Sequence, residues 1–354
     1  MYLQALNEKY LKYKKVKSRA PLRLSFGGGG SELSPYLEEF GGNVMNATIS
    51  MYAYTIIEPM ESNNIRFEAS DLNIVFESEA VEELDKDGSL IIHKAVYNRM
   101  IKDFNNGMPL PINISTFCDA PVGSGLGSSS TLTVSIIGGF CEILNLNLNE
   151  YEIAKLAHSI ERNDLGLSGG HQDHYSASFG GFNFIEFMPD LTVIVNPLRL
   201  KDTIISELES SLLLIYTGTS RESAKIIEEQ TKNMATMESQ QIQHFHDIKA
   251  QAVKMKEYLL TADFNNFATT LNKAWEAKKA TTDLITNSNI NHIYRIAKDA
   301  GALGGKISGA GGGGFMMLVC DPSLKMNVLR ILEENNCTNY VCKFVNHGLQ
   351  TWQS

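Results

Sequence analysis

The sequence of 354 residues is poor in cysteine, in positive charge and in long apolar runs. Its five cysteines form no CxxC pair, which argues against a thiolate metal site and favours reduced thiols in a cytoplasmic protein. Asp and Glu (40) outnumber Lys and Arg (31), so the net charge is −9 and no nucleic-acid partner is expected. No run reaches the roughly 18 apolar residues of a membrane span, and residues 1–21 lack the apolar core of a secretory signal, so no membrane partner is expected.

The chain also lacks an internal repeat and a strict alternation of strands with helices. Alternating or β-branched residues predict strands at 22–26, 44–58 and 111–117, whereas residues 128–144 are apolar on every side and predict a buried helix. The mixture predicts an α+β fold. A turn-forming segment near residue 190 divides the chain into two expected domains, residues 1–190 and 191–354.

Glycine is ordinary in amount but unusual in placement. Of the 28 glycines, 24 fall in four short clusters, at residues 27–42, 123–139, 166–181 and 301–314. Collagen-like or low-complexity sequence would spread glycine evenly, so both are excluded. The clusters instead indicate loops in which the backbone approaches something closely.

The second cluster, DAPVGSGLGSSS, connects the strand at 111–117 to the buried helix. Three alternate glycines allow a tight loop, and we expect Ser128 to be the N-cap, with Ser129 and Ser130 in the first turn. The free amides and the positive dipole end of such a helix attract phosphate, and the hydroxyls can reach a phosphate-bound Mg²⁺. An ordinary glycine turn capped by serine is the alternative, and no Walker A motif is present.

The fourth cluster matches GxGxxG at Gly309, Gly311 and Gly314, but it runs into a strand rather than a helix. A dinucleotide-binding loop is therefore not expected, whereas a backbone wall against a ligand is. The first cluster follows the strand that carries Arg23 and offers Ser31-Glu32 to substrate hydroxyls, the alternative being a long irregular loop.

The third cluster is surrounded by titratable side chains. On a helix at 149–163, Glu161 lies on the inward face, whereas Arg162 points away. A buried carboxylate needs a partner, and a cation is the obvious one, although a glutamate at a frayed helix end would also explain the pattern. Asp173 follows Gly169-Gly170 and is a candidate general base.

Two other chemistries are suggested by the same segment. GLSGG at 166–170 matches the GxSxG of serine hydrolases, but a helix rather than a strand precedes it. His158, His171, Asp173 and His174 could hold a metal, but they lack HExxH spacing, and a polar loop is the better interpretation.

Three of the clusters, taken in order, resemble the three motifs of the GHMP kinases, the superfamily of galactokinase, homoserine kinase and mevalonate kinase. APLRLSFGGGGSELSPY is similar to the first motif, APVGSGLGSSS to the second and KISGAGGGGF to the third. The resemblance extends from about residue 19 to 320. It implies an N-terminal domain like domain 2 of ribosomal protein S5, a ferredoxin-like C-terminal domain, and ATP bound between them.

The resemblance also implies roles for individual residues. Asp173 would accept or orient the substrate proton beside Arg23, and Ser129 and Glu161 would hold Mg²⁺. The ATP phosphates would be cradled by Gly123, Ser124, Gly125, Leu126, Gly127, Ser128 and Ser129. The acceptor would contact Gly29, Gly30, Ser31, Glu32, Gly170, His171, Gly309, Ala310 and Gly311, with Arg221 and Lys306 as candidate cations for its phosphate.

Within the superfamily the chain is most similar to the heptose 7-phosphate kinase branch, through RAPLRLSFGGGG, GGNVMNAT and YTGTSRESAKII. It departs from that branch at Ser31-Glu32, where GGGTD is usual, and at His171 and His174. The resemblance implies phosphorylation of the anomeric hydroxyl of a heptose 7-phosphate. A kinase for a hexose or uronic acid and a catalytically silent sugar and ATP sensor are the alternatives. No pattern sets an oligomeric state.

Overall fold

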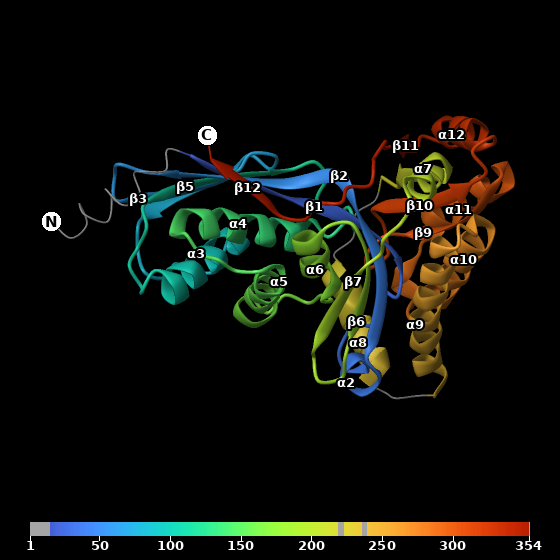
Figure 1. Ribbon diagram of the computed structural model, residues 1–354, viewed down its shortest axis with the longest axis horizontal. Coiled ribbons are helices and arrows are strands. Elements are labelled where there is room, and N and C mark those ends of the chain that lie inside the picture. The colour runs from blue at the N-terminus through green and yellow to red at the C-terminus, as the bar shows by residue number, and fades with distance from the viewer. Residues whose placement is uncertain (1–14, 219–222, 236–238, 354) are drawn as a thin grey trace.

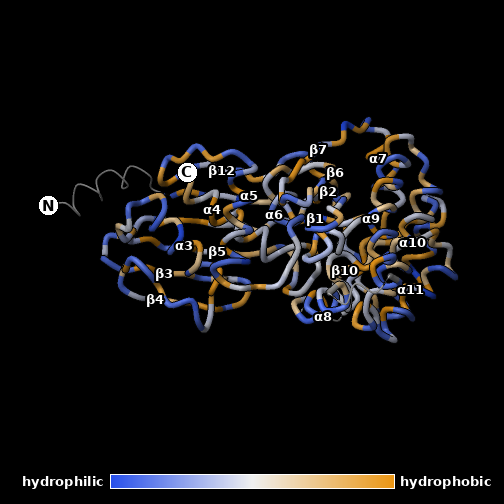
Figure 2. The backbone as a smooth tube through the Cα atoms, turned by 90° about the horizontal axis from the view of Figure 1, so that it is seen from below, coloured by the Kyte–Doolittle hydropathy of each residue, from blue (hydrophilic) through white to orange (hydrophobic). Residues whose placement is uncertain are grey.

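The computed structural model describes residues 15–218, 223–235 and 239–353. Within these ranges the chain forms an elongated molecule with two sheets (Figure 1). Figure 2 shows β3, β4 and α3 at one end, α10 and α11 at the other, and β1 and α6 near the middle. None of the helices in the described part is long and apolar enough to cross a membrane.

The larger sheet is built around two long strands. β1 (Val16–Gly27) is flanked by β12 (Gln350–Gln353) and β2 (Gly42–Pro59), all antiparallel. The first part of β2 pairs with β6 (Phe182–Phe187) and the second part with β5 (Ile112–Cys118). The order β12-β1-β2-β5-β3-β4 is completed by β3 (Asn64–Ala69) and β4 (Ile74–Glu79), and β7 (Val193–Pro197) pairs with β6.

Helices cover one face of this sheet. They are α3 (Ile91–Phe104), α4 (Ser128–Leu144), α5 (Glu150–Ser159) and α6 (Gln172–Phe179), as Figure 1 shows. α4 packs against β1 and β2 and is buried over most of its length, which confirms the expected central helix. Gly138 allows close packing, because a Cβ there would lie 2.6 Å from Leu349.

The smaller sheet has the order β11-β8-β10-β9 and is antiparallel throughout. Its strands are β8 (Leu212–Tyr216), β9 (Ala302–Ile307), β10 (Phe315–Cys320) and β11 (Thr338–Asn339). The helices of this half are α7 (Asp202–Ser211), α8 (Ser223–Ala235), α9 (Ser239–Leu260), α10 (Phe264–Lys279), α11 (Ser288–Ala300) and α12 (Lys325–Glu334). α9 packs against both β1 and β2, so the two halves share an apolar core.

The division at residue 190 does not coincide with the division between the sheets. β7 lies beyond residue 190 but belongs to the larger sheet, and β12 returns from the far end of the chain to pair with β1. Phe344 packs against Phe26 and Phe182 on the way. The α+β architecture is as expected, whereas the larger sheet takes strands from both sides of the expected boundary.

Candidate active site

Three adjoining cavities form one cleft, and two of them, the central and the deep cavity, are lined by residues of both halves. The central cavity, of about 310 Å³, is lined by the glycine loop 123–127, the start of α4, Glu161 and Asp173. The deep cavity, of about 60 Å³, shares Arg23 and Asp173 with it and continues to Glu32 and Lys278. The apolar cavity, of about 280 Å³, shares Val122, Ser128 and Ser129 with it on the other side.

Three glycines of the loop before α4 have a left-handed backbone conformation that other residues rarely adopt. Gly123, Gly125 and Gly127 have φ values of 72°, 75° and 78°. Gly127 occupies the N-cap position and no side chain caps the helix, so the expectation that Ser128 is the N-cap is wrong, and Ser128 is the first helical residue. Because a cap without a side chain leaves the first-turn amides free of a protein oxygen, they can bind an anion.

The second and fourth glycine clusters pack against each other through their backbones. A Cβ at Gly125 would lie 2.5 Å from the carbonyl oxygen of Ser308, and one at Gly309 would lie 2.5 Å from the carbonyl oxygen of Gly125. The amide of Phe315 donates to the carbonyl of Ser124 at 3.0 Å. These glycines are therefore needed for a contact between two loops from opposite halves, in addition to any contact with a ligand.

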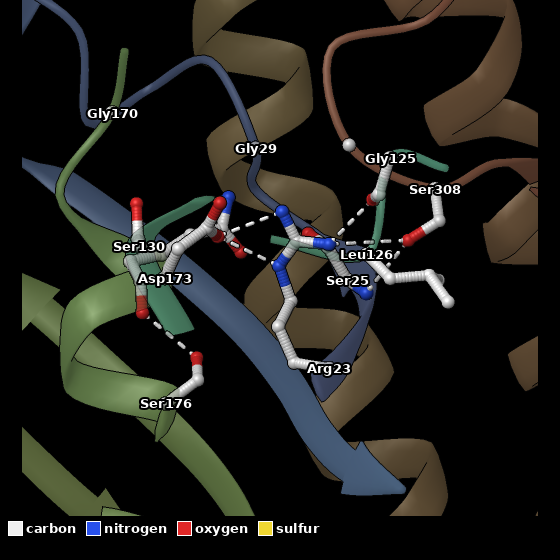
Figure 3. A network of polar contacts seen from close by, with 12 residues as sticks. Arg23, Ser25, Gly29, Gly125, Leu126, Ser130, Gly170, Asp173, Ser176 and Ser308 are labelled. Carbon is white, nitrogen blue, oxygen red and sulfur yellow. Dashed lines mark hydrogen bonds and ion pairs between the residues drawn. The ribbon is translucent and has the colours of Figure 1, made fainter. Parts of the chain in front are cut away.

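Arg23 connects the loops around the central cavity (Figure 3). Its Nε and Nη2 both lie 2.7 Å from Oδ1 of Asp173, and Nη1 donates to the carbonyl of Gly125 at 2.7 Å. Nη1 also lies 3.4 Å from the Ser308 hydroxyl. The strand residue that the sequence analysis singled out thus joins the phosphate-type loop, α6 and the fourth glycine cluster in one network.

Asp173 stands in the first turn of α6 and faces the start of α4. A Cβ at Gly127 would lie 3.1 Å from its Oδ2, so the carboxylate covers this glycine directly. Both Arg23 contacts go to Oδ1, and the side chain is 22% exposed on the cavity side. Oδ2 is therefore placed to accept a proton from a ligand in the cavity.

Glu161 is buried on the inward face, as the helical pattern predicted, although its turn is a π-helix (Ile160–Asp164) rather than a continuation of α5. Its Oε1 accepts from Ser129 and Thr133 at 2.9 Å, and its Oε2 accepts from Ser130 at 2.8 Å and lies 2.9 Å from Nε2 of His174. Burial alone would raise the pKa of Glu161, but His174, Arg162 and the hydrogen bond from Ser130 lower it to about 2. The carboxylate is therefore ionised at neutral pH.

Arg162 does not point away from the site as expected. Its guanidinium donates to the carbonyls of Leu167 at 3.1 Å and Gly170 at 3.3 Å, and lies 3.3 Å from Glu161. It thereby fixes the loop that leads to Asp173. The turn does not follow the 3.6-residue period on which the expectation was based, because it is a π-helix.

Ser129 and Glu161 suit a magnesium ion by their chemistry. Both are oxygen donors, both line the central cavity, and Mg²⁺ prefers a few protein oxygens completed by phosphates and water. Within residues 15–218, 223–235 and 239–353, no three His, Cys, Asp or Glu side chains group in a way that could hold a metal without such help.

The deep cavity is lined by polar side chains, three of which, Arg23, Glu32 and Asp173, were expected from the sequence. Glu32 accepts from the Gly30 amide at 2.7 Å and from Nε2 of Gln172 at 2.6 Å, and burial raises its pKa. Gln172, Gln230 and Lys278 also line the cavity and were not expected. Gln172 could have been noticed beside Asp173 in GGHQD, whereas nothing local distinguishes the other two.

Two expected substrate contacts are committed to the backbone instead. The hydroxyl of Ser31 donates to the carbonyl of Gly28 at 2.8 Å and also lies 3.2 Å from the carbonyl of Asn43, and the residue is fully buried. The ammonium of Lys306 donates to the carbonyl of Ser25 at 2.9 Å and does not line the cavities. Burial lowers the pKa of Lys306 well below its usual value. The Lys306 ammonium is therefore committed to the protein backbone.

Other expected contacts lie beside the cleft rather than in it. The ring of His171 stacks on that of His158 at 3.9 Å, and burial lowers the pKa of His171 to about 4. Gly311 packs against Ile285. Arg221 lies outside the described residues. Ser124 and Leu126 belong to the glycine loop but are buried. The expected residues that do line the cavities are Arg23, Gly29, Gly30, Glu32, Gly123, Gly125, Gly127, Ser128, Ser129, Glu161, Gly170, Asp173, Gly309 and Ala310.

The helix N-terminus without a side-chain cap lies below an aspartate–arginine pair and beside a polar pocket, an arrangement that suits phosphoryl transfer to a small molecule. Residues 91–181 match the N-terminal domain of GHMP kinases and residues 255–337 match their C-terminal domain. The chain belongs to the GHMP kinase family and is a sugar kinase.

Relatives of higher sequence identity indicate which branch of the family the chain resembles. The chain is 45% identical over 340 residues to D-glycero-alpha-D-manno-heptose 7-phosphate kinase of Campylobacter jejuni, covering 96% of this chain and 99% of that protein. It is similar to the crystal structure of a D-glycero-D-manno-heptose 1-phosphate kinase from Bacteroides thetaiotaomicron, with a TM-score of 0.82, 40% identity, and coverage of 96% and 99%. A sugar kinase structure from Campylobacter jejuni matches with a TM-score of 0.80 and 44% identity over the same shares.

Proposed function

We propose that the protein transfers the γ-phosphoryl group of Mg-ATP to the anomeric C1 hydroxyl of D-glycero-D-manno-heptose 7-phosphate and so forms the 1,7-bisphosphate. The observation that carries the proposal is the position of Asp173. It lies over Gly127 at the start of α4 and borders the polar deep cavity at the same time. A base in that position can serve a hydroxyl on one side and face a phosphate on the other.

The three cavities suit the three parts of such a reaction. The apolar cavity suits the nucleoside, since it is lined by Leu72, Ile74, Leu90, Phe117 and Leu132 and joins the central cavity at Ser128. The phosphates are assigned to the loop 123–127 and to the first amides of α4. The acceptor hydroxyl is assigned to the mouth of the deep cavity, beside Asp173 and between Gly29 and Gly309.

The mechanism follows from these positions. Oδ2 of Asp173 takes the proton of the sugar's C1 hydroxyl while the oxygen of that hydroxyl bonds to the γ-phosphorus. The bond from the γ-phosphorus to the β,γ-bridging oxygen breaks, and its electron pair leaves with ADP. Arg23 holds Asp173 through Oδ1 and adds positive charge beside the transferring group. Ser129 and Glu161 would hold Mg²⁺, which would offset charge on the β- and γ-phosphates.

The acceptor is assigned from the relatives rather than from the cavity. The Campylobacter protein at 45% identity is named for a heptose 7-phosphate, and the Bacteroides structure for a heptose 1-phosphate. Phosphorylation at C1 of a 7-phosphate would supply a cytoplasmic route to nucleotide-activated heptose for capsule or lipopolysaccharide. The deep cavity measures about 60 Å³, and one water takes about 10–15 Å³ of such space, so we assign only the reacting end of a heptose to it.

A panel of acceptors tests the proposal. The full chain is incubated with Mg-ATP and one sugar at a time, and ADP release is followed alongside ³¹P NMR of the product. We expect turnover with heptose 7-phosphate to exceed that with heptose, hexoses, hexose phosphates and uronic acids by at least tenfold, with a new anomeric phosphate signal. Turnover with a hexose or uronic acid alone would overturn the acceptor, and sugar binding without ADP release would indicate a sensor.

A further inference from the structure

Lys278 is a cation buried at the meeting point of two glycine loops. It occupies the last turn of α10, and its side chain reaches across to the larger sheet. Its ammonium donates to the carbonyl of Gly309 at 2.6 Å and lies 3.5 Å from the carbonyl of Gly29. The residue is 4% exposed, and what remains accessible lines the deep cavity.

The described residues do not use all of the hydrogen-bonding capacity of this ammonium. An ammonium has three N–H donors, and the two carbonyl contacts account for one good bond and one long one. Burial lowers the pKa of Lys278 to about 8, which the nearby carboxylate of Glu32 opposes. A buried cation with a remaining donor that borders a cavity is costly unless a ligand uses it.

Gln172 lines the same cavity and presents the complementary group, a hydrogen-bond acceptor. Its Nε2 donates to Glu32, whereas its Oε1 is buried and has no hydrogen-bond partner among the described residues. The residue is 5% exposed and lines the deep cavity. Buried amide oxygens usually have a partner, and at this one, in a residue that lines a cavity, a ligand can supply the donor.

The charges around the cavity indicate which part of a substrate it accepts. Arg23 and Lys278 contribute two positive charges, and Glu32 and Asp173 contribute two negative charges, within one small space. A dianionic phosphate would face two carboxylates there, whereas hydroxyl groups can donate to the carboxylates and accept from the cations. The balanced lining therefore suits the neutral, hydroxyl-bearing end of an acceptor.

We infer that Lys278 and Gln172 are acceptor-binding residues that read two neighbouring hydroxyl groups of the sugar, Lys278 by donating to one oxygen and Gln172 by accepting from the other hydroxyl. The inference rests on the proposed sugar kinase function and extends it to residues outside the three glycine motifs. Lys278 also fixes the distance between Gly29 and Gly309, the two walls of the cavity.

A cycle of enzyme variants and substrate analogues tests this inference. Wild type, Lys278→Met and Gln172→Met are assayed with heptose 7-phosphate and with its monodeoxy forms, and kcat/KM for the sugar is measured with KM for ATP. We expect each variant to lose about 10- to 100-fold in kcat/KM for the full sugar, the effect of one hydrogen bond to a charged or buried group, with KM for ATP within about threefold. On the one deoxy sugar that lacks the hydroxyl contacted by the replaced residue, the variant and the wild type should have the same kcat/KM.

Lys279→Met is the matched control, because it removes the adjacent lysine on the same helix, which pairs with Glu276 outside the cavity. Lys278→Gln, which keeps a donor for Gly309, serves if Lys278→Met melts far below wild type. Two outcomes would show a purely structural role and overturn the inference. In one, the loss from the variant multiplies the loss from the missing hydroxyl for every deoxy sugar. In the other, KM for ATP rises in step with the loss in kcat/KM for the sugar.

The experiment separates this inference from the proposed function. Calorimetric titration of the sugar in the presence of a non-hydrolysable ATP analogue repeats the cycle without turnover. If wild type accepts a different sugar, the heptose assignment fails, and the cycle is run on deoxy forms of that sugar. If wild type accepts heptose 7-phosphate but shows no coupling, only the roles of Lys278 and Gln172 fail. If no sugar binds, both fail.

Discussion

Replacing Asp173 by asparagine keeps the shape of the side chain and removes its ability to take a proton. The amide oxygen of asparagine can still accept from Arg23, whose Nε and Nη2 both lie 2.7 Å from Oδ1 in the wild type. General-base catalysis contributes roughly 10²–10⁴ to a rate. We therefore expect kcat to fall by that factor, or about 2.7–5.4 kcal/mol at about 1.36 kcal/mol per tenfold.

The same change carries a separate cost in stability. The Arg23 side chain is 4% exposed and the Asp173 side chain 22% exposed, so the pair lies between a surface and a buried ion pair. Breaking a buried pair costs about 3–5 kcal/mol and a surface pair about 0–1. Since Arg23 keeps its bond to the Gly125 carbonyl, we expect the free energy of unfolding to fall by about 1–3 kcal/mol.

The two effects are separated by measuring turnover well below the melting temperature, together with KM for ATP and thermal unfolding. Asp164→Asn is a matched control. Asp164 pairs with Arg99 at 2.5 Å, both side chains are 22% exposed, and the pair lies outside the cleft. The control should lose stability but not turnover. Turnover of Asp173→Asn within about threefold of wild type would refute the base role.

Three further changes test other parts of the cleft. Gly125→Ala should weaken ATP binding and destabilise the chain by more than the roughly 1–2 kcal/mol of a left-handed residue, since its Cβ would strike the Ser308 carbonyl. Gly166 has a similar φ with open space around it, so Gly166→Ala measures the backbone strain alone in thermal unfolding. Equal losses of stability in the two variants would refute a clash between the Cβ of Gly125→Ala and the Ser308 carbonyl. Glu161→Gln should raise the Mg²⁺ concentration for half-maximal activity about 10- to 100-fold, and an unchanged Mg²⁺ titration would remove Glu161 from the site. Because burial lowers the pKa of Lys278 to about 8, its charge is present below that pH and lost above it, so kcat/KM for the sugar should fall as the pH rises past 8. Arg23, Glu32 and Asp173 also face this ammonium, and Lys278→Met separates their effect from that of Lys278. The fall in kcat/KM should disappear in this variant, and a fall that persists would assign the titration to another group.

The loop and helix at the phosphate end could be predicted from sequence because their signals are local. A β-branched strand, alternate glycines and a helix apolar on every side are each readable within about twenty residues. The prediction of Ser128 as the N-cap was wrong for a local reason as well. Serine is usually favoured at an N-cap, but Gly127 takes the left-handed conformation and is itself the N-cap.

The residues around the deep cavity could not be predicted in the same way. Lys278 and Lys279 are neighbours in EAKKA, yet one is buried between two glycine loops and the other pairs with Glu276 on the surface. Lys306 and Ser31 carried the residue types expected of a substrate contact, but the fold turns both toward backbone carbonyls. Only the tertiary arrangement decides whether such a side chain meets a cavity or a carbonyl.

The return of β12 to β1 affects how the chain is made. Before translation reaches residues 349–353, β1 has an open edge, and α4 lacks the side chain that packs at Gly138. The helix that begins at the phosphate loop thus reaches its final packing only after residue 349 has been made, because the contact at Gly138 joins residues that are far apart in the sequence. Stalled or truncated products would display a free strand edge, which favours association between copies.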